Sequence, residues 1–354
     1  RTIENSYHMF QQNLMFRRLA LSNFGMLLFG IIRDPAMIRY LNNDRNRKQA
    51  PNENLARELM ELFSLGEGHY EESDIKEGAR ALTGYTYEGN AFVFDERAHD
   101  GGTKRILGVS GTLDGDDFVK AILARRACSE FIALKLYRFF VRTPSEDAPE
   151  DKAVETVVRG LASELLKERY DLKPMLRTLF LSEHFYDPGN RGTQIKSPVE
   201  LVVGAVRSMG TPVRDLGVLN DALDRMGQQL FFPPNVAGWA GGRTWINTST
   251  LYIRQNVMNF LLTGKTPTGF DPLSSKEVYD PTSLLADLAR TEPGAERDRA
   301  KVVRYLLAFM LGDQVSASRG AALAEFGGGS GRMTPDVLTG MLTLITAMPE
   351  YQLC

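Results

Sequence analysis

The spacing of apolar residues in the segment Asn52–Leu65 is the feature that most constrains the fold. Leucine and phenylalanine recur there every three or four residues, so at 100° per residue they fall on one side of a helix. The opposite side carries an amide, a guanidinium and two carboxylates, from Asn54, Arg57, Glu58 and Glu61. Two such different faces predict an amphipathic helix that packs its apolar side against a core.

Helical spacing recurs along most of the 354 residues, and it predicts a mainly α fold. We expect a two-lobed helical body, with one lobe in residues 1–145 and the other in residues 146–354. The seam is placed at Thr143–Glu150 because proline and acidic residues are typical of connections between domains. The second lobe should include an ordered loop at residues 230–247, which is rich in Pro, Gly and Trp.

The sequence pattern predicts two further helices in the first part of the chain. One long apolar helix is expected at Phe10–Ile32. The pair Asp34-Pro35 is typical of the start of the next helix, because Asp caps the first turn and Pro suits the first helical position.

One region departs from the helical pattern and has the pattern typical of strands. Tyr85–Glu88 and Ala91–Asp95 flank Gly89-Asn90, a turn signal of the kind that joins the two strands of a hairpin. A glycine-rich loop and the segment Lys104–Val109 follow. The sequence therefore predicts a small β-hairpin excursion near residues 85–109, inserted between helices.

Composition excludes several classes of function. Hydrophobic residues make up 43% of the chain and charged residues 24%, as in an ordinary soluble globular protein. The net charge of −2 argues against a nucleic-acid binder and gives no reason to expect an anionic membrane as partner. No apolar run reaches the ~20 residues that span a bilayer, so no transmembrane segment is expected. The chain also has no C-x-x-C pair and no zinc-protease, hydrolase-elbow or Walker motif.

The polar face of the first amphipathic helix has two interpretations. It is either a solvated face with ion pairs at helical spacing or a functional face. In the functional interpretation Glu58 and Glu61 form a catalytic acid/base pair or bind a metal. Arg57 and Asn54 would then orient the substrate.

The loop that begins at His99-Asp100 is the second candidate. An imidazole and a carboxylate on a glycine-rich loop can act in catalysis or bind a divalent metal, and Lys104 could hold an anionic group of the substrate. The alternative is a tight turn in which Asp100 caps the backbone. We expect Arg80 and this loop to meet Glu58 and Glu61 in one polar cleft.

The third candidate is the aromatic loop at residues 230–247, which contains both tryptophans of the chain. Aromatic faces can stack on sugar rings and amides can bind hydroxyls, so Asn235, Trp239 and Trp245 are candidate substrate-binding residues for a glycan. The alternative is an ordered loop that fills the helical core with Trp and Pro. Long ordered loops are often functional.

Several pieces of the chain, in the same order, resemble the bacterial family of unknown function numbered 1800. The matching segments are Asn52–Leu62, Ala79–Gly84, His99–Lys104, Lys196–Glu200 and Pro233–Trp239. The sequence departs from the family pattern at Tyr85, where relatives tend to have Trp. The resemblance implies a mainly helical protein, often exported and hence periplasmic or secreted, and often encoded beside a sulfatase-like protein of the family numbered 1501. It carries over no activity.

Three functions are consistent with these observations. The first is a binding or assembly protein of the bacterial cell envelope that acts with a partner protein and binds glycan. The second is a hydrolase-like enzyme that uses paired carboxylates, with or without a divalent metal. The third is a purely structural helical module. Whether the protein is an enzyme stays open at this stage.

Overall fold

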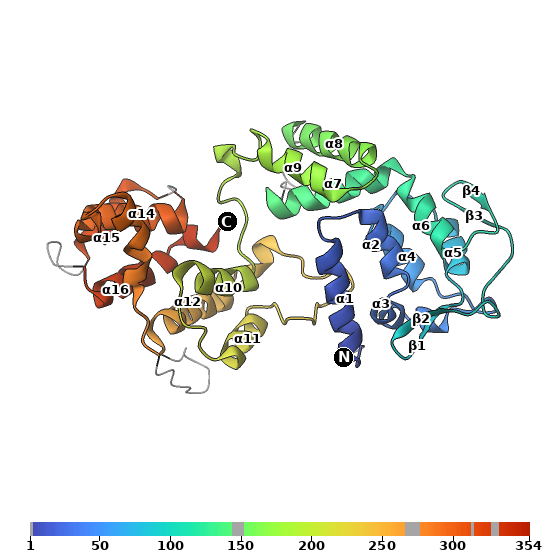
Figure 1. The fold of residues 1–354 in the computed structure, drawn as a ribbon, viewed down its shortest axis with the longest axis horizontal. Helices are drawn as coiled ribbons and strands as arrows, with labels where there is room; N and C mark the ends of the chain where they lie inside the picture. Colours follow the sequence, from blue (N-terminus) through green and yellow to red (C-terminus); the bar gives the residue numbers. More distant parts are fainter. Residues whose placement is uncertain (1–2, 144–151, 266–276, 313–314, 327–332) are drawn as a thin grey trace. The chain divides into compact units, whose positions relative to one another are not determined.

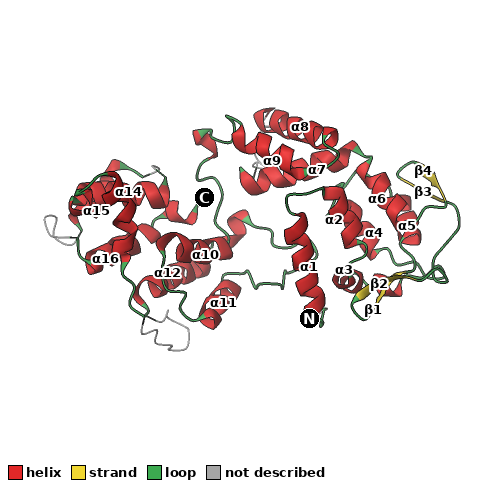
Figure 2. Cartoon of the chain, viewed as in Figure 1, coloured by secondary structure: helices red, strands yellow, loops and turns green. Residues whose placement is uncertain are grey.

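The structure is a computed structural model that describes residues 3–143, 152–265, 277–312, 315–326 and 333–354. The chain forms two compact units, residues 1–187 and 188–354, each with its own hydrophobic core. The prediction of a mainly α protein is confirmed, because helices make up nearly all the regular structure of both units (Figure 2). Among the described residues, none of the helices combines the length and apolar character needed to cross a membrane.

The elements of the first unit follow one another along the chain as labelled in Figure 1. The helices are α1 (Ser6–Leu19), α2 (Phe24–Ile31), α3 (Pro35–Tyr40), α4 (Asn54–Glu61), α5 (Glu72–Ala81), α6 (Gly115–Leu123), α7 (Arg126–Phe140), α8 (Lys152–Lys167) and α9 (Leu172–Leu181). The strands are β1 (Tyr85–Glu88), β2 (Ala91–Phe94), β3 (Lys104–Ile106) and β4 (Val109–Gly111), and a 3-10 turn, η1, spans Asn43–Arg45.

The second unit is built from helices and short 3-10 turns in its described residues. The helices are α10 (Pro198–Met209), α11 (Leu216–Arg225), α12 (Thr248–Thr263), α13 (Ala286–Thr291), α14 (Arg299–Leu311), α15 (Ala317–Glu325) and α16 (Pro335–Thr346). The 3-10 turns are η2 (Pro188–Asn190), η3 (Gly242–Trp245), η4 (Pro281–Leu285), η5 (Ala295–Arg297) and η6 (Pro349–Gln352).

Helix α4 has the amphipathic character that its sequence predicts. Its apolar residues Leu55, Leu59 and Met60 are completely buried in the core of the first unit. The helix is shorter than expected, because it ends at Glu61. The backbone amides of Leu65 and Gly66 fold back to donate to the Met60 carbonyl oxygen, which satisfies an acceptor at the helix end.

The single long helix expected at Phe10–Ile32 is wrong, because the chain breaks into α1 and α2. The Asn23 side chain accepts from the Met26 amide and so caps the start of α2. Next to it, the Phe24 amide donates to the Tyr170 carbonyl oxygen and the Leu172 amide donates to that of Ser22. These bonds to a distant segment replace the bonds that a continuous helix would make.

The predicted hairpin is confirmed and a second one follows it. Strands β1 and β2 pair in antiparallel fashion around Gly89-Asn90, and β3 pairs with β4. Tyr85, at the start of β1, is buried against Gly115 at the start of α6. A Cβ atom at Gly115 would lie 2.6 Å from Cζ of the Tyr85 ring, so only glycine fits there.

Helices α8 and α9 belong to the first unit, whereas the sequence pattern predicts them in the second lobe. Their leucines and valines continue the core on which α7 packs, and α8 lies along α7 in Figure 1. The seam expected at residues 145 and 146 lies outside the described residues.

A fragment of residues 1–187 should therefore fold alone, whereas residues 1–145 should not. The shorter fragment would expose the apolar side of α7 to water, because it lacks the core residues Val158, Leu161, Leu165, Met175 and Leu179. Circular dichroism should show a cooperative thermal transition for residues 1–187 and none for residues 1–145. Equally sharp transitions in both fragments would contradict the assignment of α8 and α9.

Candidate functional site

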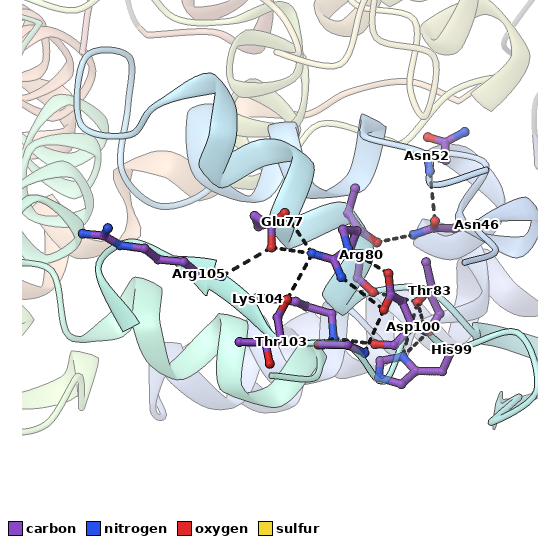
Figure 3. Close-up of polar contacts among 12 residues, drawn as sticks. Asn46, Asn52, Glu77, Arg80, Thr83, His99, Asp100, Thr103, Lys104 and Arg105 are labelled. Atoms are coloured by element: carbon purple, nitrogen blue, oxygen red, sulfur yellow. Dashed lines mark hydrogen bonds and ion pairs between the residues drawn. The ribbon is translucent and has the colours of Figure 1, made fainter. Parts of the chain in front are cut away.

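Two buried asparagines organise the polar part of the first unit. The Asn46 amide group donates to Oδ1 of Asn43 at 3.0 Å and to the carbonyl oxygen of Ala79 in α5 at 2.9 Å. Oδ1 of Asn46 accepts from the Asn52 amide at 2.9 Å, as Figure 3 shows. Both asparagines are fully buried, so these bonds offset the cost of removing amide groups from water. These hydrogen bonds tie the loop of residues 42–52 to α5.

Asn43 extends the same network to the start of β1. Its amide group donates to the carbonyl oxygens of Leu82 at 3.2 Å and Tyr85 at 2.8 Å. Between these two residues lies Gly84, whose φ of +79° suits glycine. A Cβ atom there would lie 2.4 Å from the Asp95 carbonyl oxygen, so the close approach of two backbone segments also requires glycine.

Thr83 and His99 join α5 to the glycine-rich loop. The Thr83 hydroxyl donates to the Arg80 carbonyl oxygen at 2.6 Å and accepts from the Asp100 amide at 2.8 Å. Nδ1 of His99 lies 2.9 Å from the Thr83 carbonyl oxygen. A carbonyl oxygen only accepts, so Nδ1 carries the proton in this contact. That nitrogen is therefore not available to bind a metal.

Arg80 and Asp100 form the central ion pair of the site, as Figure 3 shows. Nε of Arg80 donates to Oδ2 of Asp100 at 2.7 Å, and Nη2 donates to Oδ1 at 3.2 Å. Nη1 of Arg80 donates to both carboxylate oxygens of Glu77, at 2.7 and 3.0 Å. The Arg80 guanidinium lowers the pKa of Asp100 to about 2. In return, Asp100 and then Glu77 raise the pKa of Arg80.

Lys104 lies beneath the loop with only 1% of its surface exposed. Its ammonium donates to the carbonyl oxygens of Asp100 at 2.5 Å and Gly102 at 3.1 Å. Burial lowers the pKa of Lys104, and the nearby Asp100 charge opposes that shift. The loop residues above it, Gly101 to Thr103, are exposed. Lys104 therefore fixes the loop from below.

The polar face of α4 makes its own set of contacts. Arg57 pairs with Glu72 at 2.7 Å and with Glu53 at 3.1 Å. The Tyr70 hydroxyl donates to Glu61 at 2.9 Å. This hydrogen bond contributes, after burial, to raising the pKa of Tyr70 to about 12.

Glu58 differs from its neighbours on that face. It is half-buried, and no hydrogen bond or ion pair of its carboxylate occurs among the described residues. Burial, followed by the neighbouring Glu61 charge, raises the pKa of Glu58, while Arg57 opposes the shift. Asn54, at the start of the helix, is exposed. Its backbone amide donates to the Asn52 side chain.

The structure gathers the predicted residues of the first unit into two groups. Arg80, His99, Asp100 and Lys104 belong to one network, and the α4 face belongs to another. Within the described residues, no hydrogen bond or ion pair joins Glu58 or Glu61 to the loop. Nor does any group of three or more His, Cys, Asp or Glu side chains there have the arrangement of a metal site. The catalytic and metal-binding roles stay predictions.

The candidates of the aromatic loop belong to the second unit and differ in exposure. Trp245, in η3, is 7% exposed, and its carbonyl oxygen accepts from the Thr250 hydroxyl at 2.9 Å. Trp239 is half-buried, while Asn235 is exposed and caps the Ala237 amide. Trp245 thus fits the interpretation of a loop that packs into the helical core. Of these three candidates, Trp239 and Asn235 have surface that a ligand can reach.

Comparison with known proteins shows the family to which this chain belongs. A family model described as "Protein of unknown function (DUF1800)" matches residues 2–353. The chain belongs to this family. No match was found among the curated proteins or the solved structures. In this member of the family, the segments Ala79–Gly84 and His99–Lys104, which carried the resemblance, meet in the Arg80–Asp100 network.

Asn43, Asn46 and Thr83 hold that network together, but the sequence does not mark them as candidates. An asparagine in a polar segment reads as a turn residue, and nothing in its sequence context shows that it is buried. Two asparagines three residues apart, followed by Pro51, were the one available signal of a structured loop.

Replacing Asp100 with Asn should destabilise the first unit by roughly 2 kcal/mol at pH 7, because its pKa is lowered from 3.8 to about 2. A lowered pKa stabilises the fold above the unfolded value near 4, and this contribution is lost as pH falls towards 2. The difference between wild type and variant, measured by urea unfolding, should therefore disappear near pH 2. The exposed control Asp224→Asn should have little effect at either pH. If the difference in unfolding free energy between wild type and variant did not depend on pH, the ion pair would be contradicted.

Proposed function

We propose that this chain is an exported binding or assembly protein of the bacterial cell envelope that acts with a partner protein. Its recognition surface includes the exposed loop residues Gly101 to Thr103. The observation that carries the proposal is the closed charge network beneath that loop. Arg80 pairs with both Glu77 and Asp100, and Lys104 bonds to backbone carbonyl oxygens.

A network of this kind suits recognition better than catalysis. A general base needs a pKa near the working pH, and the pKa of Asp100 is held at about 2. Both of its carboxylate oxygens accept from Arg80. His99 is likewise engaged through Nδ1. In this proposal the polar groups of Arg80, Asp100 and Lys104 support the loop.

Rigid support of an exposed loop favours binding in a specific way. Ordering a loop upon binding costs conformational entropy, and a loop fixed in advance avoids that cost. Here Arg80 also donates to the Thr103 carbonyl oxygen at 3.3 Å, so both ends of the exposed stretch are held. Gly101 to Thr103 themselves stay exposed, so this stretch is accessible to a partner.

Family membership supports the choice of partner. The resemblance of the sequence to exported relatives favours a periplasmic or secreted location. It also favours a sulfatase-like protein of the family numbered 1501 as partner. Glycan is the proposed second ligand, because Trp239 and Asn235 of the second unit are accessible for stacking and hydrogen bonding.

Two variants test the role of the loop. Thr103→Arg adds bulk to the exposed surface, and Lys104→Met removes the support beneath it. Each should weaken binding to the sulfatase-like protein by about tenfold or more, measured by biolayer interferometry. Thr103→Arg should leave the melting temperature unchanged.

The exposed residue Lys76 on α5 offers a matched control, because Lys76→Met makes the same substitution at a position on the surface. This control should bind like the wild type. Absence of any interaction between the wild-type chain and the sulfatase-like protein would refute the proposed partner. Unchanged binding by both loop variants would refute the role of the loop.

A hydrolase-like enzyme is the second candidate function, and one observation favours it. The Glu58 carboxylate is half-buried, lacks a partner among the described residues and has a raised pKa. These properties suit a general acid, with Glu61 as the second carboxylate. A divalent metal bound by His99 and Asp100 remains part of this alternative, although no third ligand accompanies them in the described residues.

If the second candidate is correct, the protein should release reducing sugars from isolated envelope glycan. Glu58→Gln should then lower the rate by about a hundredfold or more. The wild-type rate should fall as pH rises through the raised pKa of Glu58, because a general acid must be protonated. Glu88→Gln, which removes an exposed carboxylate from β1, is the control. No release by the wild type, with or without added divalent metal, would exclude this candidate.

A further inference from the structure

Four cationic residues lie on two neighbouring segments beside the loop network, and we call them the basic rim. Its members are Arg45, Arg47, Lys48 and Arg97. The Lys48 amide donates to the Ala98 carbonyl oxygen at 2.9 Å, which places the residue 45–48 segment next to the residue before His99. The basic rim therefore combines two segments that lie far apart in the sequence.

The cations of the basic rim differ from the other arginines of this region in their pairing. Arg39, Arg57 and Arg80 each contact a carboxylate within 3.2 Å. In the part of the chain that the structure describes, no carboxylate lies within ion-pair distance of any member of the basic rim. Arg45, Lys48 and Arg97 are exposed, and Arg47 is half-buried with its Nη1 on the Asn46 carbonyl oxygen.

The acidic residues beside the basic rim do not neutralise it. Asp44 already pairs with Arg39. Oδ1 of Asp95 accepts from the backbone amides of Arg97 and Ala98, so this carboxylate faces the turn itself. Glu96 is exposed and is the remaining acid within these two segments. Four positive charges therefore outnumber the adjacent negative ones, although the chain as a whole has a net charge of −2.

We propose that the basic rim binds an anionic glycan of the cell envelope, one that carries carboxylate or phosphodiester groups along its length. This inference rests on the proposed function and names the class of glycan. Exposed cations on adjacent segments create a local field that attracts a polyanion. Arginine guanidinium groups also match the geometry of carboxylate and phosphate oxygens. A polymer engages several such cations at once, so contacts that are individually weak add up.

The triple variant Arg45→Gln, Lys48→Gln, Arg97→Gln tests the inference. These side chains are exposed, so the variant should fold and melt like the wild type. Binding to fluorescent polygalacturonate, measured by fluorescence anisotropy at about 20 mM salt, should weaken by about tenfold or more. Wild-type binding should itself weaken when salt is raised to about 150 mM, because ions screen exposed charges. A glycerol-phosphate polymer in place of the polyuronate distinguishes phosphodiesters from carboxylates as the recognised groups.

The matched control removes the same number of positive charges elsewhere. Lys173→Gln, Arg207→Gln, Arg304→Gln changes three exposed cations that have no carboxylate partner among the described residues. This control should bind the polyanions like the wild type. Equal losses of polyanion affinity in both triple variants would show an effect of net charge only and would overturn the inference.

Two further outcomes separate this inference from the proposed function. The wild type could bind the sulfatase-like protein or neutral glycan but neither polyanion. That result would overturn the proposed role of the basic rim and leave the proposed function intact. Equal affinity for duplex DNA would also overturn it, because the rim would then not select a glycan. Binding to neither partner protein nor any envelope glycan would refute the proposed function itself.

Discussion

The contact between Arg80 and Asp100 joins two segments that are twenty residues apart, and the polar part of the first unit is organised around it. Every polar group of Asp100 is used in this arrangement. Its carboxylate accepts from Arg80, its amide donates to Thr83 and its carbonyl oxygen accepts from Lys104. Because these bonds connect Asp100 to three different residues, a change at one of them alters the position of the whole loop.

Such a network contributes more to the choice of one conformation than to net stability. Removing a cation such as Lys104 from water is costly, and no carboxylate among the described residues contacts it. Two carbonyl oxygens accept from it instead. The bonds roughly offset the cost only when the loop has this one geometry. Alternative loop conformations would leave a buried charge without partners. That difference explains how an exposed glycine-rich stretch can keep a defined shape.

Much of this fold could be predicted from local sequence patterns. The apolar spacing of α4, the Asp34-Pro35 start of α3 and the Gly89-Asn90 turn all depend on neighbouring residues, and the structure confirms them. The break between α1 and α2 could not be predicted in this way. It depends on backbone bonds to Tyr170 and Leu172, which lie far away in the sequence.

The candidate site shows the same limit. A polar helix face indicates which residues avoid the core, but it does not show which other segment they meet. The α4 carboxylates and the His99 loop were expected to share one cleft, and among the described residues no hydrogen bond or ion pair joins them. The burial of Asn46 and Lys104 was equally hidden, because a side chain of either type is usually exposed. Only the three-dimensional arrangement shows that their bonds are satisfied.

The packing of Tyr85 against Gly115 has a consequence for how this family can diverge. The phenol ring occupies the space that a methyl group at position 115 would need. An indole in place of the phenol would demand still more room along the first turn of α6. Evolution at these two positions should therefore be coupled. A methyl group at position 115 would require the ring at position 85 to move, and a larger ring would require the start of α6 to shift.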